Sequence, residues 1–559
     1  MVVMSERAVR VLPWLWPVLL TLLITAPLLA PGYVVGYDMV FVPDLTVRLD
    51  LFGVTTAMPR AVPSDVIVAV LDEAVGGQVL NKVVLVAIPL LSGLGMTALW
   101  RELRLGTALP GAAAVTLFVW NPFVAERLRL GAWALLLGYA ALPWLVRSAL
   151  RLRKGSGWPG FLLASAGCAL TASGGITGLL VAGLILLWPG RGRVWPLGGA
   201  VLLNAPWLVA GLVHAGKATV DPASVIAFAA RDEGYGGALP TLLTLGGVWN
   251  AAVVPGNRGD LLPLIFAFVM LLASVAGVVL WGRQDRIVGA LVVAAALTVV
   301  VGMAGVVAPG LVADIVANVP GAGLFRDGQR YLGPLVLLQS IGFGVAVHTL
   351  LHHVPLHRVV GATAVLLPIA ALPALAGGAG LKVSHYPSDW SRAQQVLAGP
   401  FIPWPFESYR APVWNGRRPV LDPMPRYFDQ PAVVPDELIV GGHRLAGEDP
   451  RAATVATAFR TAIRSGTDPT PVLLEQGVGW LVFDREAGGP SPRDSIAGLT
   501  EVYAGMTVSV YQLPGTPAPQ PNQPWRTAVV LAAWVVAGAT LAAAGAGLVT
   551  RRSTVWRSR

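Results

Sequence analysis

The sequence predicts an all-α polytopic membrane protein of about 12 transmembrane helices that also carries a small extracytoplasmic α/β domain. Of its 559 residues, 55% are hydrophobic and only 13% are charged. Mean hydropathy is +0.66, which is too high for a soluble protein of this length because a soluble protein needs a polar surface. Long apolar runs alternate with short charged loops, and one soluble-like segment interrupts this pattern near the C-terminus.

Twelve apolar segments approach the roughly 20 residues that a helix needs to cross a bilayer. The third segment is short, and the fifth and sixth meet at the Ser-Gly-Gly turn 173–175, so we expect short helices there. The predicted spans are 12–32, 83–100, 107–120, 131–146, 159–173, 176–188, 195–213, 261–282, 287–307, 334–350, 359–380 and 527–550.

The loops between these spans alternate in charge. Every second loop is rich in arginine, for example 101–104, 147–154 and 283–286, whereas the intervening loops are not. Because Lys and Arg prefer the cytoplasmic side, we expect both termini in the cytoplasm of a plasma (inner) membrane and the soluble domain outside. The net charge of +10 then reports membrane topology. We therefore expect membrane lipids, and no nucleic acid, as partners.

Composition sets the expected domain boundaries. Residues 1–380 hold all but the last span and form a transmembrane domain. Residues 381–525 are rich in Pro, Arg, Asp and Trp, and two strand-like runs plus a helical pattern over 449–464 predict a small α/β domain. The Pro-rich stretch 514–524 is a linker, and 526–559 form the last transmembrane helix with a basic cytoplasmic tail.

The first extracytoplasmic loop, 33–82, supplies three candidate site residues. Asp38 and Asp44 follow the first span closely, and low-dielectric surroundings raise the pKa of a carboxylate toward the range useful for a general base. The alternative is that these acids are solvated or cap short helices. At the end of the loop, Lys82 is placed to reach a phosphate or to anchor the chain at the interface.

Two further loops carry paired charges. Glu126 and Arg127 either orient a substrate phosphate or sugar, or form a buried ion pair that braces two helix ends. Arg326 and Arg330, four residues apart, face the same way if their segment is helical, and a guanidinium group matches phosphate oxygens with two parallel hydrogen bonds. Their alternatives are anionic lipid headgroups or pairing with Asp327.

Trp249 lies in the long loop after the seventh span. It is placed to stack on a sugar face, although tryptophan is also common at membrane interfaces. The sequence holds no Walker loop, dinucleotide fingerprint, serine nucleophile elbow or zinc-ligand spacing. Charged residues are almost absent from the spans, which argues against an ion-coupled transporter.

The first-loop aspartates, the segment NPFVAERLRLGAWALLLGYAALPW and the loop FRDGQRY resemble the membrane glycosyltransferases of the GT-C fold. The nearest group is the actinobacterial cell-envelope arabinofuranosyl- and mannosyltransferases, and the resemblance covers the layout of residues 10–350. It implies a polyprenyl-phosphate sugar donor on the outer face, with Asp38 as the base and Asp44 in support. The adjacent acidic pair of many members is absent from 33–50, a departure that leaves open both the use of a divalent metal and a fold retained without catalysis. We expect no required cofactor.

We therefore expect an integral membrane glycosyltransferase that moves a sugar from a polyprenyl-phosphate donor to a cell-envelope glycan or glycolipid acceptor. Arg326 and Arg330 would hold the donor phosphate, and Glu126 and Arg127 would shape the site. Two alternatives belong to other classes. One is a polytopic lipid-sugar flippase or transporter, and the other is a non-catalytic GT-C-like scaffold that recruits envelope enzymes through 381–525.

Overall fold

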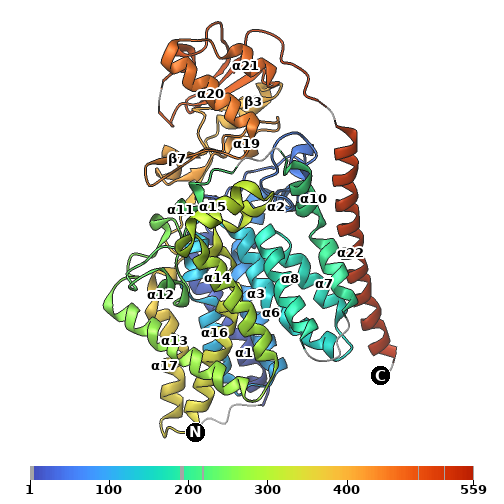
Figure 1. Ribbon diagram of the computed structural model, residues 1–559, viewed down its shortest axis with the longest axis vertical. Helices are drawn as coiled ribbons and strands as arrows, with labels where there is room; N and C mark the ends of the chain where they lie inside the picture. Colours follow the sequence, from blue (N-terminus) through green and yellow to red (C-terminus); the bar gives the residue numbers. More distant parts are fainter. Residues whose placement is uncertain (1–5, 189–193, 217–219, 489, 522, 558–559) are drawn as a thin grey trace.

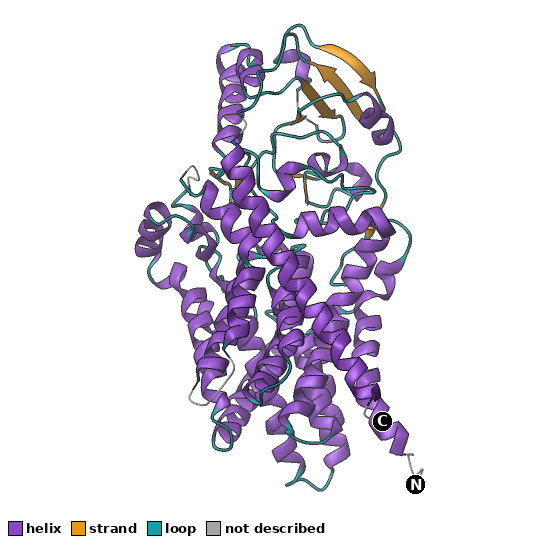
Figure 2. Cartoon of the chain, turned by 90° about the vertical axis from the view of Figure 1, so that its right-hand side faces the viewer, coloured by secondary structure: helices purple, strands orange, loops and turns teal. Residues whose placement is uncertain are grey.

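The computed structural model describes residues 6–188, 194–216, 220–488, 490–521 and 523–557. A long helical body carries an α/β region at one end, and the last helix runs along the side of the body (Figure 1). The start of the first helix and the end of the last helix both lie at the end opposite the α/β region. Figure 2 shows the strands gathered at that one end.

Among the described residues, seven helices are long and apolar enough to cross a membrane, and the bent pair α9 (Trp195–Leu203) and α10 (Ala205–His214) makes an eighth if it counts as one span. The chain is thus a mostly helical, multi-pass membrane protein. The seven spans are α3 (Gly77–Leu103), α4 with α5 (Ala108–Val119 and Pro122–Arg129), α6 (Trp133–Arg153), α13 (Leu261–Gly282), α14 (Ile287–Val307), α16 (Gly333–Leu351) and the apolar part of α22 (Pro524–Arg557).

The predicted number of about 12 spans is not reached by this criterion. The remaining predicted segments contain helices that do not meet this criterion, namely α1 (Glu6–Thr25), α7 (Trp158–Cys168), α8 (Ala172–Leu187) and α17 (His357–Ala371). The predicted turn at 173–175 is wrong, because these residues lie inside α8. The break between α7 and α8 comes at 169–171, where Thr171 caps α8 by accepting from Gly174 N.

Close backbone contact holds the centre of the helical body together. A Cβ atom on Gly277 of α13 would lie 1.8 Å from the backbone oxygen of Gly342 on α16. Small residues at such crossings let helices approach closely. Close packing matters in a membrane, because lipid tails are as apolar as the helices and the hydrophobic effect does not drive the helices together. Helix α5 and the start of α16 border one small cavity, which Phe123 and Gly333 help to line.

The α/β region contains a four-stranded mixed sheet in the order β3-β8-β10-β9. Its strands are β3 (Phe401–Trp404), β8 (Trp480–Asp484), β9 (Thr500–Ala504) and β10 (Val508–Gln512). Only the β3–β8 pair is parallel. Helix α20 (Pro450–Ser465), near the predicted 449–464, packs on the sheet, with the ring of Phe459 4.8 Å from that of Trp404. A small mixed α/β region is therefore present, while the exact boundaries 381 and 525 stay predictions.

Shorter elements connect the body and the α/β region. Strand β1 (Tyr33–Val34), directly after the first helix, pairs with β2 (Val383–Ser384). The other short elements are α2 (Ser64–Val75), α11 (Ser224–Ala227), α12 (Ala238–Leu243), α15 (Pro309–Asn318), α18 (Trp390–Val396), β4 (Tyr409–Arg410), β5 (Val420–Leu421), α19 (Met424–Tyr427), β6 (Leu438–Val440), β7 (His443–Leu445) and α21 (Thr470–Glu475).

Side-chain contacts also bind the α/β region to loops of the body. Arg426 pairs with Asp65 at 2.8 Å, and Arg60 pairs with Asp436 at 3.4 Å. Arg48 Nη1 donates to the backbone oxygen of Phe428 at 2.9 Å. The α/β region is therefore docked on the body by contacts far from its linker.

Candidate functional site

The backbone next to Asp38 joins the α/β region. Tyr37 N donates to Pro419 O at 2.8 Å, and Leu421 N donates to Tyr37 O at 2.8 Å. The loop that carries Asp38 is thereby added as a neighbour of β5 in the small β4–β5 sheet.

The other side of Asp38 is fixed to the helical body. Asp38 N donates to Leu130 O, at the end of α5, at 3.1 Å. Gly131, which follows Leu130, has φ +77°. A Cβ atom on Gly131 would lie 2.2 Å from Met39 N and 2.8 Å from Asp38 N. Only glycine allows this approach, so two separate parts of the chain determine where Asp38 lies.

The carboxylate of Asp38 lies where the α/β region meets the helical body. Tyr409 Oη donates a hydrogen bond to Asp38 Oδ1. Burial raises the pKa of the Asp38 carboxyl group above its ordinary value, the Tyr409 hydrogen bond and the charges of Arg330 and Arg426 oppose this rise, and the charge of Asp327 adds to it. The side chain nevertheless remains exposed to solvent. We refer to Asp38 together with the side chains that act on it as the recess.

Arg330 lies between this recess and an apolar cavity. Its Nη2 pairs with Asp327 Oδ2 at 3.0 Å, and its side chain is 39% exposed. Its Nε has no hydrogen-bond partner among the described residues. The cavity lies among α5, α6, α8 and α16 and is lined by Phe123, Leu135, Gly138, Tyr139, Leu142, Gly174, Thr177, Arg330 and Gly333. This cavity has a volume of about 10 Å³, enough for about one water molecule, so the guanidinium group borders a small internal space.

Arg326 and Arg330 do not share a helix face. Their segment forms two short 3-10 turns, 322–325 and 328–331, with Arg326 and Asp327 between them. Gly328 lies so close to α14 that a Cβ there would be 2.2 Å from Val301 O. This contact interrupts the helix on which the predicted shared face depended.

Arg326 instead points to the α/β region. Its Nη1 is ion-paired with Glu448 Oε1, and its guanidinium group lies 5.2 Å from the ring centre of Phe228. The ring of Trp249 packs edge-on against Phe228 at 4.9 Å. Trp249 also belongs to a small apolar cluster with Tyr37, so it lies near the loop of Asp38.

Glu126 and Arg127 form the buried ion pair that was one of the two interpretations. Asn121 caps the start of α5 by accepting from Val124 N at 3.0 Å, which fixes the first turn. Arg127 Nη1 lies 2.7 Å from Glu126 Oε2, and Arg127 Nη2 donates to Gln329 O at 3.0 Å. The pair therefore holds the backbone next to Arg330.

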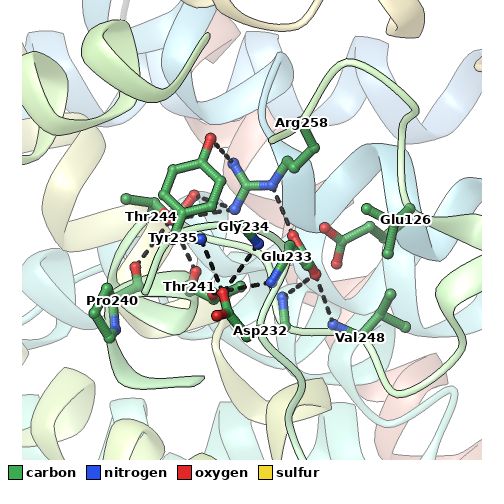
Figure 3. A network of polar contacts seen from close by, with 12 residues as sticks. Glu126, Asp232, Glu233, Gly234, Tyr235, Pro240, Thr241, Thr244, Val248 and Arg258 are labelled. Carbon is green, nitrogen blue, oxygen red and sulfur yellow. Dashed lines mark hydrogen bonds and ion pairs between the residues drawn. The ribbon is translucent and has the colours of Figure 1, made fainter. Parts of the chain in front are cut away.

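A second buried pair, Glu233 with Arg258, lies beside Glu126 (Figure 3). Arg258 Nε lies 2.7 Å from Glu233 Oε2, and its Nη1 donates to Tyr235 Oη at 3.1 Å. Glu126 Oε1 points toward Glu233 and has no hydrogen-bond partner among the described residues. Sequence reasoning missed this network, because Glu233 and Arg258 lie in a long loop without regular spacing.

Asp44 and Lys82 lie apart from the recess. Asp44 is exposed, and together with Glu73 it adds to the effect of burial, which raises the pKa of Asp72 to about 6. It is not among the charges that act most strongly on Asp38. Lys82 Nζ donates to Leu28 O at 2.7 Å, at the end of the turn after the first helix.

The structure adds site residues that the sequence did not indicate. Tyr409 is 371 positions away from Asp38 in the chain, and Arg426 also comes from the α/β region. No local pattern pointed to either residue. Among the described residues, no group of three or more His, Cys, Asp and Glu side chains is placed to hold a metal ion.

Comparison with known proteins gives a fold match. No family model and no curated protein sequence matches the chain. Its fold matches the single-particle cryo-EM structure of arabinofuranosyltransferase AftD from Mycobacteria, with a TM-score of 0.59 and 18% identity over 93% of this chain and 40% of that chain. Two structural classes of an AftD mutant also match. Class 2 has a TM-score of 0.58 and 16% identity over 92% of this chain. Class 1 has a TM-score of 0.55 and 15% identity over 93% of this chain, and each match covers 42% of the AftD chain.

The chain has the GT-C fold. This confirms the resemblance noted in the first-loop aspartates and the two charged segments. The chain spans about two fifths of the length of the AftD structures it matches. At these identities the likeness is one of fold, and the GT-C fold gives the frame in which the recess at Asp38 is interpreted.

Proposed function

We propose that this GT-C-fold protein is an integral membrane glycosyltransferase. It would transfer a sugar from a polyprenyl-phosphate donor to a hydroxyl group of a cell-envelope glycan or glycolipid on the extracytoplasmic side. The observation that carries the proposal is the solvent-reached carboxylate of Asp38, which accepts from Tyr409 and on which the charge of Arg330 acts. Arabinofuranose is the first sugar to test, because the matched structure is that of an arabinofuranosyltransferase.

The proposed reaction uses Asp38 as general base. The acceptor hydroxyl oxygen attacks the anomeric carbon of the donor, and its proton passes to the Asp38 carboxylate. The bond between the anomeric carbon and the phosphate oxygen breaks, and polyprenyl phosphate leaves with the electron pair. Burial raises the pKa of the Asp38 carboxyl group, which makes its ionised form a better proton acceptor.

The donor phosphate is assigned to Arg330. Its Nε is unpaired among the described residues, and it borders both the apolar cavity and the recess. The charge of the leaving phosphate grows as the bond breaks, so a fixed guanidinium group stabilises the transition state. Arg326 is already paired with Glu448, and in this proposal it supports the docking of the α/β region.

The orientation belongs to the proposal as well. We place both termini in the cytoplasm and the α/β region outside. The arginine-rich loops support this orientation, as does the position of the α/β region at the end opposite the termini (Figure 1).

The deciding experiment compares two Asp→Asn variants of the reconstituted protein. Asp38→Asn removes the proposed base and should lower sugar transfer by about 10²-fold or more. Asp260→Asn is the matched control, because Asp260 is exposed and caps α13 without a side-chain hydrogen bond. Transfer is measured with radiolabelled polyprenyl-phosphate arabinofuranose, and with the mannose analogue in parallel.

Three results would contradict the proposal. Full sugar transfer by the Asp38→Asn variant would show that Asp38 is not the general base. Movement of the labelled lipid across liposome membranes, without any sugar transfer by the parent protein, would instead identify a flippase. A parent protein that neither transfers sugar nor moves lipid, but binds envelope enzymes, would be a scaffold.

A further inference from the structure

The α/β region contributes a side chain directly to the recess. Tyr409 lies on β4, which pairs with β5 so that Tyr409 is opposite Leu421. On its other side, β5 is bridged by Tyr37. The residue that donates to Asp38 and the residue before Asp38 are therefore held by the same strand.

The neighbouring residue anchors β4 from inside the α/β region. Arg410 is buried and pairs with Asp422 at 2.9 Å and with Asp484 at 3.4 Å. Its Nη2 also donates to Pro405 O at 2.8 Å. Successive side chains of a strand point to opposite faces. A buried Arg410 therefore directs Tyr409 outward, to the surface where Asp38 lies.

We infer that Tyr409 is a positioning residue for the transfer reaction, and that the catalytic recess is complete only with the α/β region docked. This inference rests on the proposed function of Asp38. The Tyr409 hydroxyl donates to Oδ1 and leaves Oδ2 free to receive the proton of the acceptor. The hydrogen bond thus fixes the orientation of the carboxylate. It also stabilises the ionised form relative to the protonated form.

The other charged groups around this pair determine how large the effect is. Arg330 and Asp327 face Asp38 from the loop before α16, and Arg426 faces it from α19. Arg60 and the Tyr37 hydroxyl act on Tyr409. Both arginines that act on Asp38 remain when the Tyr409 hydroxyl is removed. The ionised form should therefore become less favoured without being lost.

Tyr409 is not needed to dock the α/β region. The ion pairs of Arg426 with Asp65 and of Arg60 with Asp436 hold that interface independently. Burial also raises the pKa of the Tyr409 hydroxyl well above its usual range, so it stays protonated and able to donate. A Phe side chain at position 409 keeps the ring and removes only the donor.

The test is the pH profile of kcat/KM for sugar transfer from polyprenyl-phosphate arabinofuranose by the full-length protein. Tyr409→Phe should move the acid limb of the profile upward by about one pH unit, because the ionised carboxylate loses a hydrogen bond. Tyr427→Phe is the matched control. Tyr427 is a buried tyrosine of the same region, and its hydroxyl makes no hydrogen bond among the described residues.

The outcomes separate this inference from the proposed function. An upward shift in Tyr409→Phe alone supports it. An unchanged acid limb in Tyr409→Phe, or an equal shift in Tyr427→Phe, overturns it, even when Asp38→Asn is inactive and the proposed function stands. Full transfer by Asp38→Asn overturns both.

Discussion

Two sites in the molecule combine carboxylates with arginines, and they differ in access to water. At Glu126 and Glu233, both carboxylates are buried, and each has its own arginine, Arg127 and Arg258. At Asp38 the carboxylate is exposed, and its fixed partner is the hydroxyl of Tyr409. The first site joins α5 to the turn before α16, and the second is open to solvent.

This difference indicates which charges serve structure and which serve chemistry. A buried ion pair has lost its water, so its members depend on each other. Arg127 also holds the backbone beside Arg330, which links the buried site to the open one. We therefore expect substitutions at the buried site to change stability first, and substitutions at the recess to change activity first.

The largest effect on stability is expected for Arg127→Ala. It leaves Glu126 buried without its cation, which should lower the free energy of unfolding by about 3–5 kcal/mol. Glu126→Gln should cost less than Arg127→Ala, because the amide oxygen can still accept from Arg127 although it no longer neutralises the arginine. Thermal unfolding in detergent, followed by tryptophan fluorescence, measures both. Equal melting temperatures for Arg127→Ala and the parent protein would remove the distinction between the two sites.

A smaller effect, confined to activity, is expected for Arg330→Ala. Loss of a charged hydrogen bond to the donor phosphate should raise the free energy of the transition state by about 1.5–3 kcal/mol. The value of kcat/KM falls accordingly, with little change in melting temperature. Arg444→Ala is the control, because its pair with Glu437 is on the surface, with the arginine 58% exposed. A similar loss of activity in both variants would mean that Arg330 has no special contact with the donor.

The smallest effect concerns Asp72, beside the exposed Asp44. Its pKa is raised by burial to about 6, so protonation favours the folded state. Its contribution to stability is fully present below the pKa of the unfolded chain, about 3.9, and is lost as the pH rises through about 6. The Asp72→Asn variant should therefore have a melting temperature that depends less on pH between pH 4 and pH 7 than that of the parent protein. A variant whose melting temperature depends on pH as the parent's does would contradict this.

The sequence was sufficient for the parts of the fold that depend on local pattern. Apolar runs predicted where helices lie, and the spacing of Val455 and Phe459 predicted α20. The number of spans could not be predicted from the sequence, because a helix can end where no glycine or proline marks the break, as between Cys168 and Ala172.

The site was predicted in part. Asp38 was chosen for its place after the first helix, and it lies in the recess, although its catalytic role stays a prediction. Tyr409 and Arg426 were missed because they reach the recess through strand pairing and docking between distant segments. The expected alignment of Arg326 with Arg330 assumed a helix that Gly328 interrupts.

The contact at Gly131 means that hydrogen is the largest group this position accepts. Even a methyl group would push the first loop away and displace the carboxylate together with its strand neighbour. Such a change would leave every acid, base and hydroxyl in place. In a mutational survey scored by sugar transfer, a residue with no reactive atom should then rank beside the proposed general base.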